Sequence, residues 1–167
     1  MGLSSKALDE IIAYLCDEIG GDWLLAGGAL VRLEFDAERG TEDVDLVRVS
    51  HPELSDEMAK HTLFKWLIAR GSGPEWVNSA VEPFVREVPN WQNELVFVRA
   101  GRKGRILRPT LTLFAYLKLR RGTDIDLSDI RAAVAKCPEG FDERKFRLWA
   151  DLKTLSRFEQ HRAALGL

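Results

Sequence analysis

Hydrophobic residues recur at two different spacings along the chain. Between residues 5 and 19 they recur every three or four positions, which predicts an amphipathic helix that ends at a pair of glycines. Between residues 44 and 49 the spacing becomes two, so that Val44 and Leu46 share one face and Asp45 lies on the other. This second pattern predicts a strand.

Short apolar runs and turn residues predict the elements around that strand. Residues 23–26 predict a strand that ends at a Gly27-Gly28 turn, and residues 29–33 predict a short helix directly after it. Residues 50–71 predict a longer helix, whose opening Ser-His-Pro sequence supplies a cap and an early proline. The first half of the chain therefore alternates helices with strands.

The second half begins with strands and then becomes helical. Residues 80–85 predict a strand whose proline favours a sheet edge or a bulge. Two further runs flank the glycines of a hairpin, at residues 95–98 and 105–108. Helical spacing then continues to the C-terminus, with a second C-terminal helix starting at Asp126.

Together these elements predict an α+β fold with a mixed sheet flanked by helices and a helical C-terminal third. We expect residues 1–108 to form an α/β core and residues 109–167 to form a helical region packed on it, as one compact unit. The length of 167 residues fits a single domain of ordinary size.

The composition narrows the classes of protein. Hydrophobic residues make up 46% and charged residues 30%, which is usual for a folded globular protein and excludes disorder. No uncharged apolar run is long enough to cross a membrane, so we expect a cytoplasmic protein without a membrane partner. Cys16 and Cys137 are far apart and lack the spacing of a zinc site or a disulfide framework. The net charge of −2 gives no overall attraction to nucleic acid.

Candidate chemistry is concentrated at the start of the strand at residues 44–49. Asp43 and Asp45 are two positions apart, so their side chains leave the same face and their carboxylates can share a divalent ion. Oxygen ligands suit Mg²⁺, which bridges nucleotide phosphates. Upstream, Gly27 and Gly28 leave backbone N–H groups open at the start of a helix, where a triphosphate can bind.

The order and spacing of these parts resemble a known superfamily. Ala-Gly-Gly-Ala-Leu-Val at residues 26–31 and Arg-Gly-Thr-Glu-Asp-Val-Asp-Leu at residues 39–46 resemble the Gly-Gly/Ser and Asp-hydrophobic-Asp motifs of the DNA polymerase β-like nucleotidyltransferases. The Arg-x-Thr-x-Asp-x-Asp-Leu form is most similar to the bacterial minimal nucleotidyltransferases, including those related to AbiE-type toxins. The Lys118 to Asp126 segment, with Asp-Leu-Ser-Asp-Ile, is similar to a Lys…Asp-Leu-x-Asp-Ile segment of these bacterial members.

The resemblance implies a metal site. Asp43 and Asp45 would hold one or two Mg²⁺ ions, and Glu82, on the predicted strand at residues 80–85, would be the third carboxylate as a metal ligand or as the base on the acceptor. Glu94 is a rival for that role. The superfamily's third carboxylate is usually an aspartate, so Glu82 relaxes the expected geometry.

The resemblance also implies nucleotide contacts. Gly27 and Gly28 would contact the phosphates, as would Arg39 and Thr41 of the shared motif. Arg39 has an alternative role as a salt bridge that organises its loop. In the C-terminal segment, Lys118 could reach the triphosphate and Asp126 could orient Lys118 or Arg121. A solvated helix face is the alternative explanation for those charges.

The resulting hypothesis is a Mg²⁺-dependent nucleotidyltransferase that uses ATP or another nucleoside triphosphate. It would move a nucleoside monophosphate group to a hydroxyl of RNA, protein or a small molecule, as part of a toxin–antitoxin pair with a cognate partner. The alternative is a non-catalytic module of the same fold that binds an antitoxin or a regulatory partner.

Overall fold

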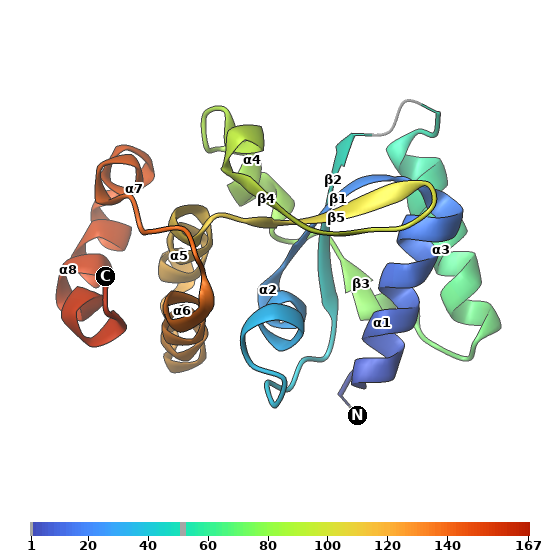
Figure 1. Cartoon of the computed structure of the whole chain (residues 1–167), viewed down its shortest axis with the longest axis horizontal. Helices are drawn as coiled ribbons and strands as arrows, with labels where there is room; N and C mark the ends of the chain where they lie inside the picture. The colour runs from blue at the N-terminus through green and yellow to red at the C-terminus, as the bar shows by residue number, and fades with distance from the viewer. Residues whose placement is uncertain (1, 51–52) are drawn as a thin grey trace.

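A five-stranded mixed sheet lies at the centre of the computed structural model, which describes residues 2–50 and 53–167 (Figure 1). The strand order is β3-β2-β1-β5-β4. The strands are β1 (Gly21–Ala26), β2 (Val44–Ser50), β3 (Val77–Asn78), β4 (Leu95–Ala100) and β5 (Gly104–Pro109). β1 pairs antiparallel with β2 and parallel with β5, which makes it the central strand. Its last four residues are all buried, as expected for a strand covered on both faces.

Helices cover the sheet and form the C-terminal third. They are α1 (Ser5–Tyr14), α2 (Gly27–Leu30), α3 (Asp56–Ala69), α4 (Glu82–Arg86), α5 (Leu111–Arg121), α6 (Asp124–Lys136), α7 (Glu143–Trp149) and α8 (Leu152–Leu165). In Figure 1, α1 and α3 lie to one side of the strands, and α5 and α6 lie between the strands and α7 and α8. The predicted α+β fold, with a mixed sheet and a helical C-terminal third, is confirmed.

Hydrophobic contacts explain this arrangement. The Tyr14 and Trp66 rings stack at 4.4 Å between α1 and α3. On the other side, Phe35 meets Phe114 of α5 edge to face at 5.7 Å, which joins the segment after α2 to the C-terminal helices. α5, α7 and α8 share a second aromatic group, in which buried Phe146 contacts Phe158, Phe141 and Tyr116.

Helix starts follow local capping rules. Ser4 caps α1 through the Ala7 N–H, and Thr123 caps α6 in a reciprocal capping box with Asp126. Two turns of π-helix, Leu15–Ile19 and Val31–Phe35, extend α1 and α2. The predicted helix at residues 5–19 is therefore confirmed over its whole length.

Two predicted elements near the sheet are wrong in detail. The long helix starts at Asp56 with Ser55 as its cap, because Ser50 is the last residue of β2. The predicted early proline and its neighbouring histidine, residues 51–52, lie outside the described residues. The short helix after the glycine turn begins at Gly27 itself.

The predicted strand at residues 80–85 is a helix instead. α4 begins at Glu82, and Pro83 lies in its first turn, where a missing N–H and a fixed φ are tolerated. Buried Val85 and Val88 are three positions apart, which is helical spacing. The strand beside β2 on the side away from β1 is β3, which is only two residues long and lies a few residues earlier in the chain.

Candidate functional site

A cleft of about 930 Å³ lies where β1 ends and β2 begins. One part of its lining is the Gly27-Gly28 turn together with the loop that leads into Asp43 and Asp45. β3 and the segment after it supply another part, beginning at Asn78. The remaining side comes from α5 and α6. The sheet therefore brings the two predicted aspartates and the two predicted glycines into one cavity, together with part of the C-terminal segment.

Asp45 lies against the glycine turn. It is opposite Ala26 in the β1–β2 register and opposite Asn78 in the β2–β3 register. Gly27 has φ of +65°, and a Cβ atom there would lie 1.9 Å from Oδ2 of Asp45. Position 27 therefore needs glycine for its backbone conformation and for the space that the Asp45 carboxylate occupies.

The surroundings of Asp45 alter its ionisation. Burial raises the pKa of Asp45, and the negative charge of Asp43 raises it further. The charges of Lys118 and Arg121 act in the opposite direction but do not cancel these effects. A cation at this position would favour the ionised form of Asp45.

Asn78 is a site residue that the sequence did not reveal. Its Nδ2 donates to Oδ2 of Asp43 at 2.6 Å, and its Oδ1 accepts from the Ala80 N–H at 2.9 Å. It therefore stands on the strand beside the Asp43 and Asp45 pair, where the third carboxylate was expected. The polar residue after Trp76-Val77 was the only signal, since a two-residue strand has no measurable period.

The two predicted third carboxylates lie elsewhere. Glu82, as the first residue of α4, pairs with Arg86 at 2.7 Å and faces Lys60 at 3.8 Å. Glu94 is buried before β4, where it accepts from Thr110 and pairs with Lys145. Among the described residues that line the cleft, neither Glu82 nor Glu94 is present. In residues 2–50 and 53–167, no three His, Cys, Asp or Glu side chains are grouped to hold a metal ion.

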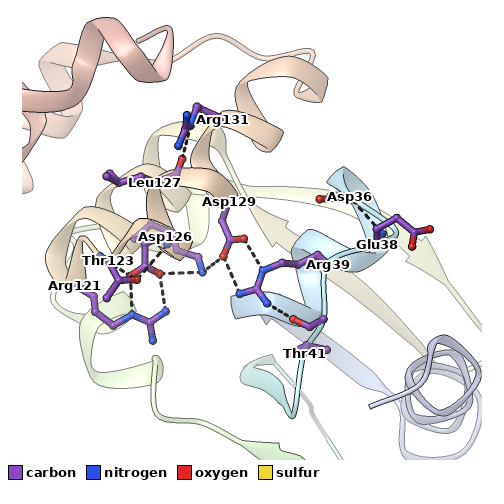
Figure 2. Close-up of polar contacts among 12 residues, drawn as sticks. Asp36, Glu38, Arg39, Thr41, Arg121, Thr123, Asp126, Leu127, Asp129 and Arg131 are labelled. Atoms are coloured by element: carbon purple, nitrogen blue, oxygen red, sulfur yellow. Dashed lines mark hydrogen bonds and ion pairs between the residues drawn. The ribbon is translucent and has the colours of Figure 1, made fainter. Parts of the chain in front are cut away.

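The loop before β2 is tied to the C-terminal helices by ion pairs. Arg39 Nε donates to Asp129 Oδ1 at 2.8 Å, and Lys118 Nζ donates to Asp129 Oδ2 at 2.6 Å. Lys118 also lies 3.3 Å from Asp126, which accepts two hydrogen bonds from Arg121. Figure 2 shows Asp129 between Arg39 and Asp126. We call these five residues the ion-pair network.

The network bears on the alternative roles predicted for its members. Arg39 forms the loop-organising salt bridge, and its guanidinium also donates to the Gly40 carbonyl. The solvated helix face is wrong for Lys118 and Asp126, whose side chains are 8% and 0% exposed. Asp126 accepts hydrogen bonds from both Lys118 and Arg121, whereas the prediction was that it orients one or the other. Arg39, Lys118, Arg121 and Asp126 all line the cleft.

Buried charges in the network are fully partnered. Burial alone would raise the pKa of Asp126, but hydrogen bonds from Arg121 and Thr123 and the charge of Lys118 hold that pKa well below its usual range. Asp129 was missed by sequence reasoning, although its place three residues after Asp126 puts both on one helix face.

Thr41 braces the aspartate loop. Its side chain is buried, and Oγ1 donates to the Asp43 carbonyl at 2.9 Å. The hydroxyl also lies close to Gly28, where an added Cβ would meet Oγ1 at 3.0 Å. Thr41 thus packs the loop against the glycine turn while lining the cleft.

Apolar side chains form another part of the cleft. Phe84 is 42% exposed and Ile125 is 56% exposed, and both line the cavity with Leu117. The guanidinium of Arg120 lies 4.7 Å from the centre of the Phe84 ring. Tyr116 Oη and Glu87 accept hydrogen bonds from Arg120 at 2.7 and 2.6 Å, so the cation is fixed over the ring.

No protein-family model, curated protein or solved structure matches this chain. None of the helices in the described part of the chain has the length and apolar character to cross a membrane.

Proposed function

We propose that the cleft binds a nucleoside triphosphate with Mg²⁺ and transfers its nucleotidyl group to a hydroxyl acceptor. The observation that supports this most is the contact between the glycine turn and the aspartate pair. Gly27 makes room for the carboxylate of Asp45, and both line a cavity of about 930 Å³. That volume lies within the range of small-molecule sites, which is about 300–1,000 Å³.

The residues present fit a single Mg²⁺ ion shared with a nucleotide. Asp43 and Asp45 offer the oxygen ligands that Mg²⁺ prefers, and one or two carboxylates plus substrate phosphates are a usual coordination set. Burial and the nearby charge of Asp43 raise the pKa of Asp45, so a cation there would favour its ionised form. When bound, the ion would neutralise charge on the phosphates and on the departing pyrophosphate.

The chain itself would bind the phosphates and orient the nucleotide. The first N–H groups of α2 have no partner within the helix, and Gly27 and Gly28 leave no side chain over them. Arg121 keeps 66% of its side chain exposed while Asp126 holds it from behind, so its free edge can meet a phosphate. The acceptor oxygen would bond to the α-phosphorus as the bond to pyrophosphate breaks, and the hydroxyl proton would pass to water.

The apolar wall would receive the base. Phe84, Leu117 and Ile125 present exposed or half-exposed hydrophobic surface within the same cleft, and Phe84 carries Arg120 on its ring. Aromatic faces and guanidinium planes bind nucleobases of any sequence by stacking. The acceptor would be RNA, a protein or a small molecule, and a toxin–antitoxin partner belongs to the same proposal.

A second candidate function is a nucleotide-binding module without transferase activity, which would act through an antitoxin or another regulatory partner. Two observations favour it. The amide of Asn78 occupies the place expected for a third carboxylate, and Glu82 is engaged with Arg86. A pair of carboxylates can still bind a Mg²⁺–nucleotide, whereas transfer needs closer control of charge at the reacting phosphorus.

The two candidates separate in one set of measurements. The chain is incubated with α-labelled nucleoside triphosphates, Mg²⁺ and pools of RNA, protein and small hydroxyl compounds, and binding is measured in parallel. Label transfer that disappears in Asp43→Asn and persists in Glu57→Gln, a matched loss of charge on α3, supports the transferase. Binding without transfer supports the module. Failure of wild type to bind any Mg²⁺–nucleotide would refute both.

A further inference from the structure

The orientation of the Asn78 side chain is fixed at both ends. Oδ1 accepts from the Ala80 N–H at 2.9 Å, and Nδ2 donates to Asp43 Oδ2 at 2.6 Å. Turning the amide over would place its oxygen against a carboxylate oxygen and its N–H₂ group against the Ala80 N–H. Both hydrogen bonds would be lost, so Asn78 presents hydrogen donors to the aspartate pair.

A hydrogen-bond donor at this position weakens the binding of a cation to the aspartate pair. An amide N–H₂ group cannot ligate a metal, and here it also occupies one oxygen of Asp43. Asn78 is opposite Asp45 in the β2–β3 register, so its partial positive charge also offsets repulsion between the two carboxylates. Asn78 therefore reduces the repulsion between the two carboxylates, as a bound cation would.

We propose that Asn78 keeps the Asp43 and Asp45 pair without a resident divalent cation, so that the cation enters together with the nucleotide. The nucleotide part of this inference rests on the proposed function. Affinity for hard cations depends on the number of anionic oxygens around them, and two partly engaged carboxylates supply few. Phosphate oxygens of the nucleotide would supply the missing ligands and displace the Asn78 hydrogen bond.

Asn78→Asp reverses this arrangement with almost no change of shape. The new carboxylate keeps its bond from the Ala80 N–H and places a second oxygen opposite Asp43, in place of the donor. Three carboxylates would then repel one another without a cation and bind one when it is present. This variant should bind Mn²⁺ alone, whereas wild type should bind it weakly.

The test measures Mn²⁺ binding by electron paramagnetic resonance and by the Mn²⁺ dependence of Tm, with and without a non-hydrolysable nucleoside triphosphate analogue. Without nucleotide, Asn78→Asp should bind Mn²⁺ at least about tenfold more tightly than wild type, and only its Tm should rise clearly with Mn²⁺. With the analogue, wild-type affinity for Mn²⁺ should rise to a similar level.

Two control variants isolate the role of the amide. Asn78→Ala removes the donor without adding a ligand and should not gain the affinity of Asn78→Asp. The double variant Asp43→Asn with Asn78→Asp exchanges acid and amide while keeping two carboxylates, so its Mn²⁺ affinity should match wild type. Tight Mn²⁺ binding by wild type alone, or equal affinities of wild type and Asn78→Asp, would overturn the inference.

The measurements remain informative if a variant folds poorly. An Asn78→Asp chain that folds only with Mn²⁺ supports the inference directly. If it fails to fold under any condition, the wild-type comparison with and without the analogue decides, since nucleotide-independent Mn²⁺ binding contradicts the inference. The comparison of Mn²⁺ binding without nucleotide needs no transferase activity. If the proposed function is refuted, the effect of Asn78 on Mn²⁺ affinity can still be measured.

Discussion

Asp129 accepts hydrogen bonds from Arg39 Nε on Oδ1 at 2.8 Å and from Lys118 Nζ on Oδ2 at 2.6 Å. This single buried side chain therefore joins the loop that leads to Asp43 with the helix that forms the opposite side of the cleft.

Asp129→Asn should strongly destabilise the chain. Asp129 and Lys118 are 1% and 8% exposed, and removing one partner of a buried pair costs about 3–5 kcal/mol because the other charge stays buried. Urea unfolding monitored by tryptophan fluorescence measures the change. Asp9→Asn, which breaks the exposed pair with Arg99, should cost no more than about 0.5 kcal/mol. Equal effects of the two substitutions would contradict the assigned role of Asp129.

Gly27→Ala should abolish binding of a Mg²⁺–nucleotide. The methyl group would displace the Asp45 carboxylate, and the positive φ alone adds about 1–3 kcal/mol of strain. Isothermal titration calorimetry and unfolding measurements on the same sample report both effects. Gly140→Ala is the matched control, since nothing lies within 4 Å of its added Cβ. Retention of wild-type nucleotide affinity by Gly27→Ala would exclude the glycine turn from the site.

The pair of Arg108 and Glu139 should make stability depend on pH. Hydrogen bonds from Arg108 hold the pKa of Glu139 below its ordinary value of 4.5. Because the folded-state pKa is lowered, the stabilising contribution is complete above pH 4.5 and is lost as pH falls through the folded-state value. Glu139→Gln should therefore reduce the free energy of unfolding by about 1.5–3 kcal/mol at pH 7.

Denaturant unfolding of wild type and Glu139→Gln from pH 7 down to pH 3 measures this difference. The two free energies of unfolding should converge at the acid end, where Glu139 gains a proton in wild type. A difference that stays constant across this range would show that the lost contacts, rather than the ionisation of Glu139, determine the effect.

Phe84→Ala should show whether Phe84 contacts the base of the nucleotide or affects binding of its phosphates. If the base stacks on Phe84, this variant should bind a nucleoside triphosphate about tenfold or more weakly, the loss expected for one stacked base. Its affinity for inorganic tripolyphosphate should be unchanged, since Phe84 carries no charge. Phe84→Trp should retain binding of both ligands. Parallel weakening for tripolyphosphate would indicate that Phe84 only supports the position of Arg120.

The elements with a clear period were predictable from the sequence. β2 and the helix at residues 5–19 each repeat their apolar positions often enough to fix the period. Residues 80–85 were predicted as a strand because valines and a phenylalanine surround Pro83, and such short runs do not separate strand from helix. Pro83 does not separate them either, because a proline is tolerated both in the first turn of a helix and at the edge of a sheet.

The candidate site likewise contains residues that the sequence predicted and residues that it did not. The place of Asp43, Asp45 and the glycine pair in one cleft was predictable because their motifs depend on local spacing along the chain. Asn78 was not, because its role comes from pairing between β3 and β2, and two residues carry no pattern of their own. Long-range contacts also determined the ion-pair network, in which Arg39 and Asp129 are ninety positions apart.

The cleft takes one wall from α5 and α6, including Lys118, Arg121 and Ile125. Ribosomes make the chain from its N-terminus, so the aspartate pair and the glycine turn are translated well before that wall exists. A nascent chain that stops after β5 would carry the acidic residues without their cationic partners. The order of synthesis thus delays assembly of the cleft until the C-terminal helices have emerged and packed against the sheet.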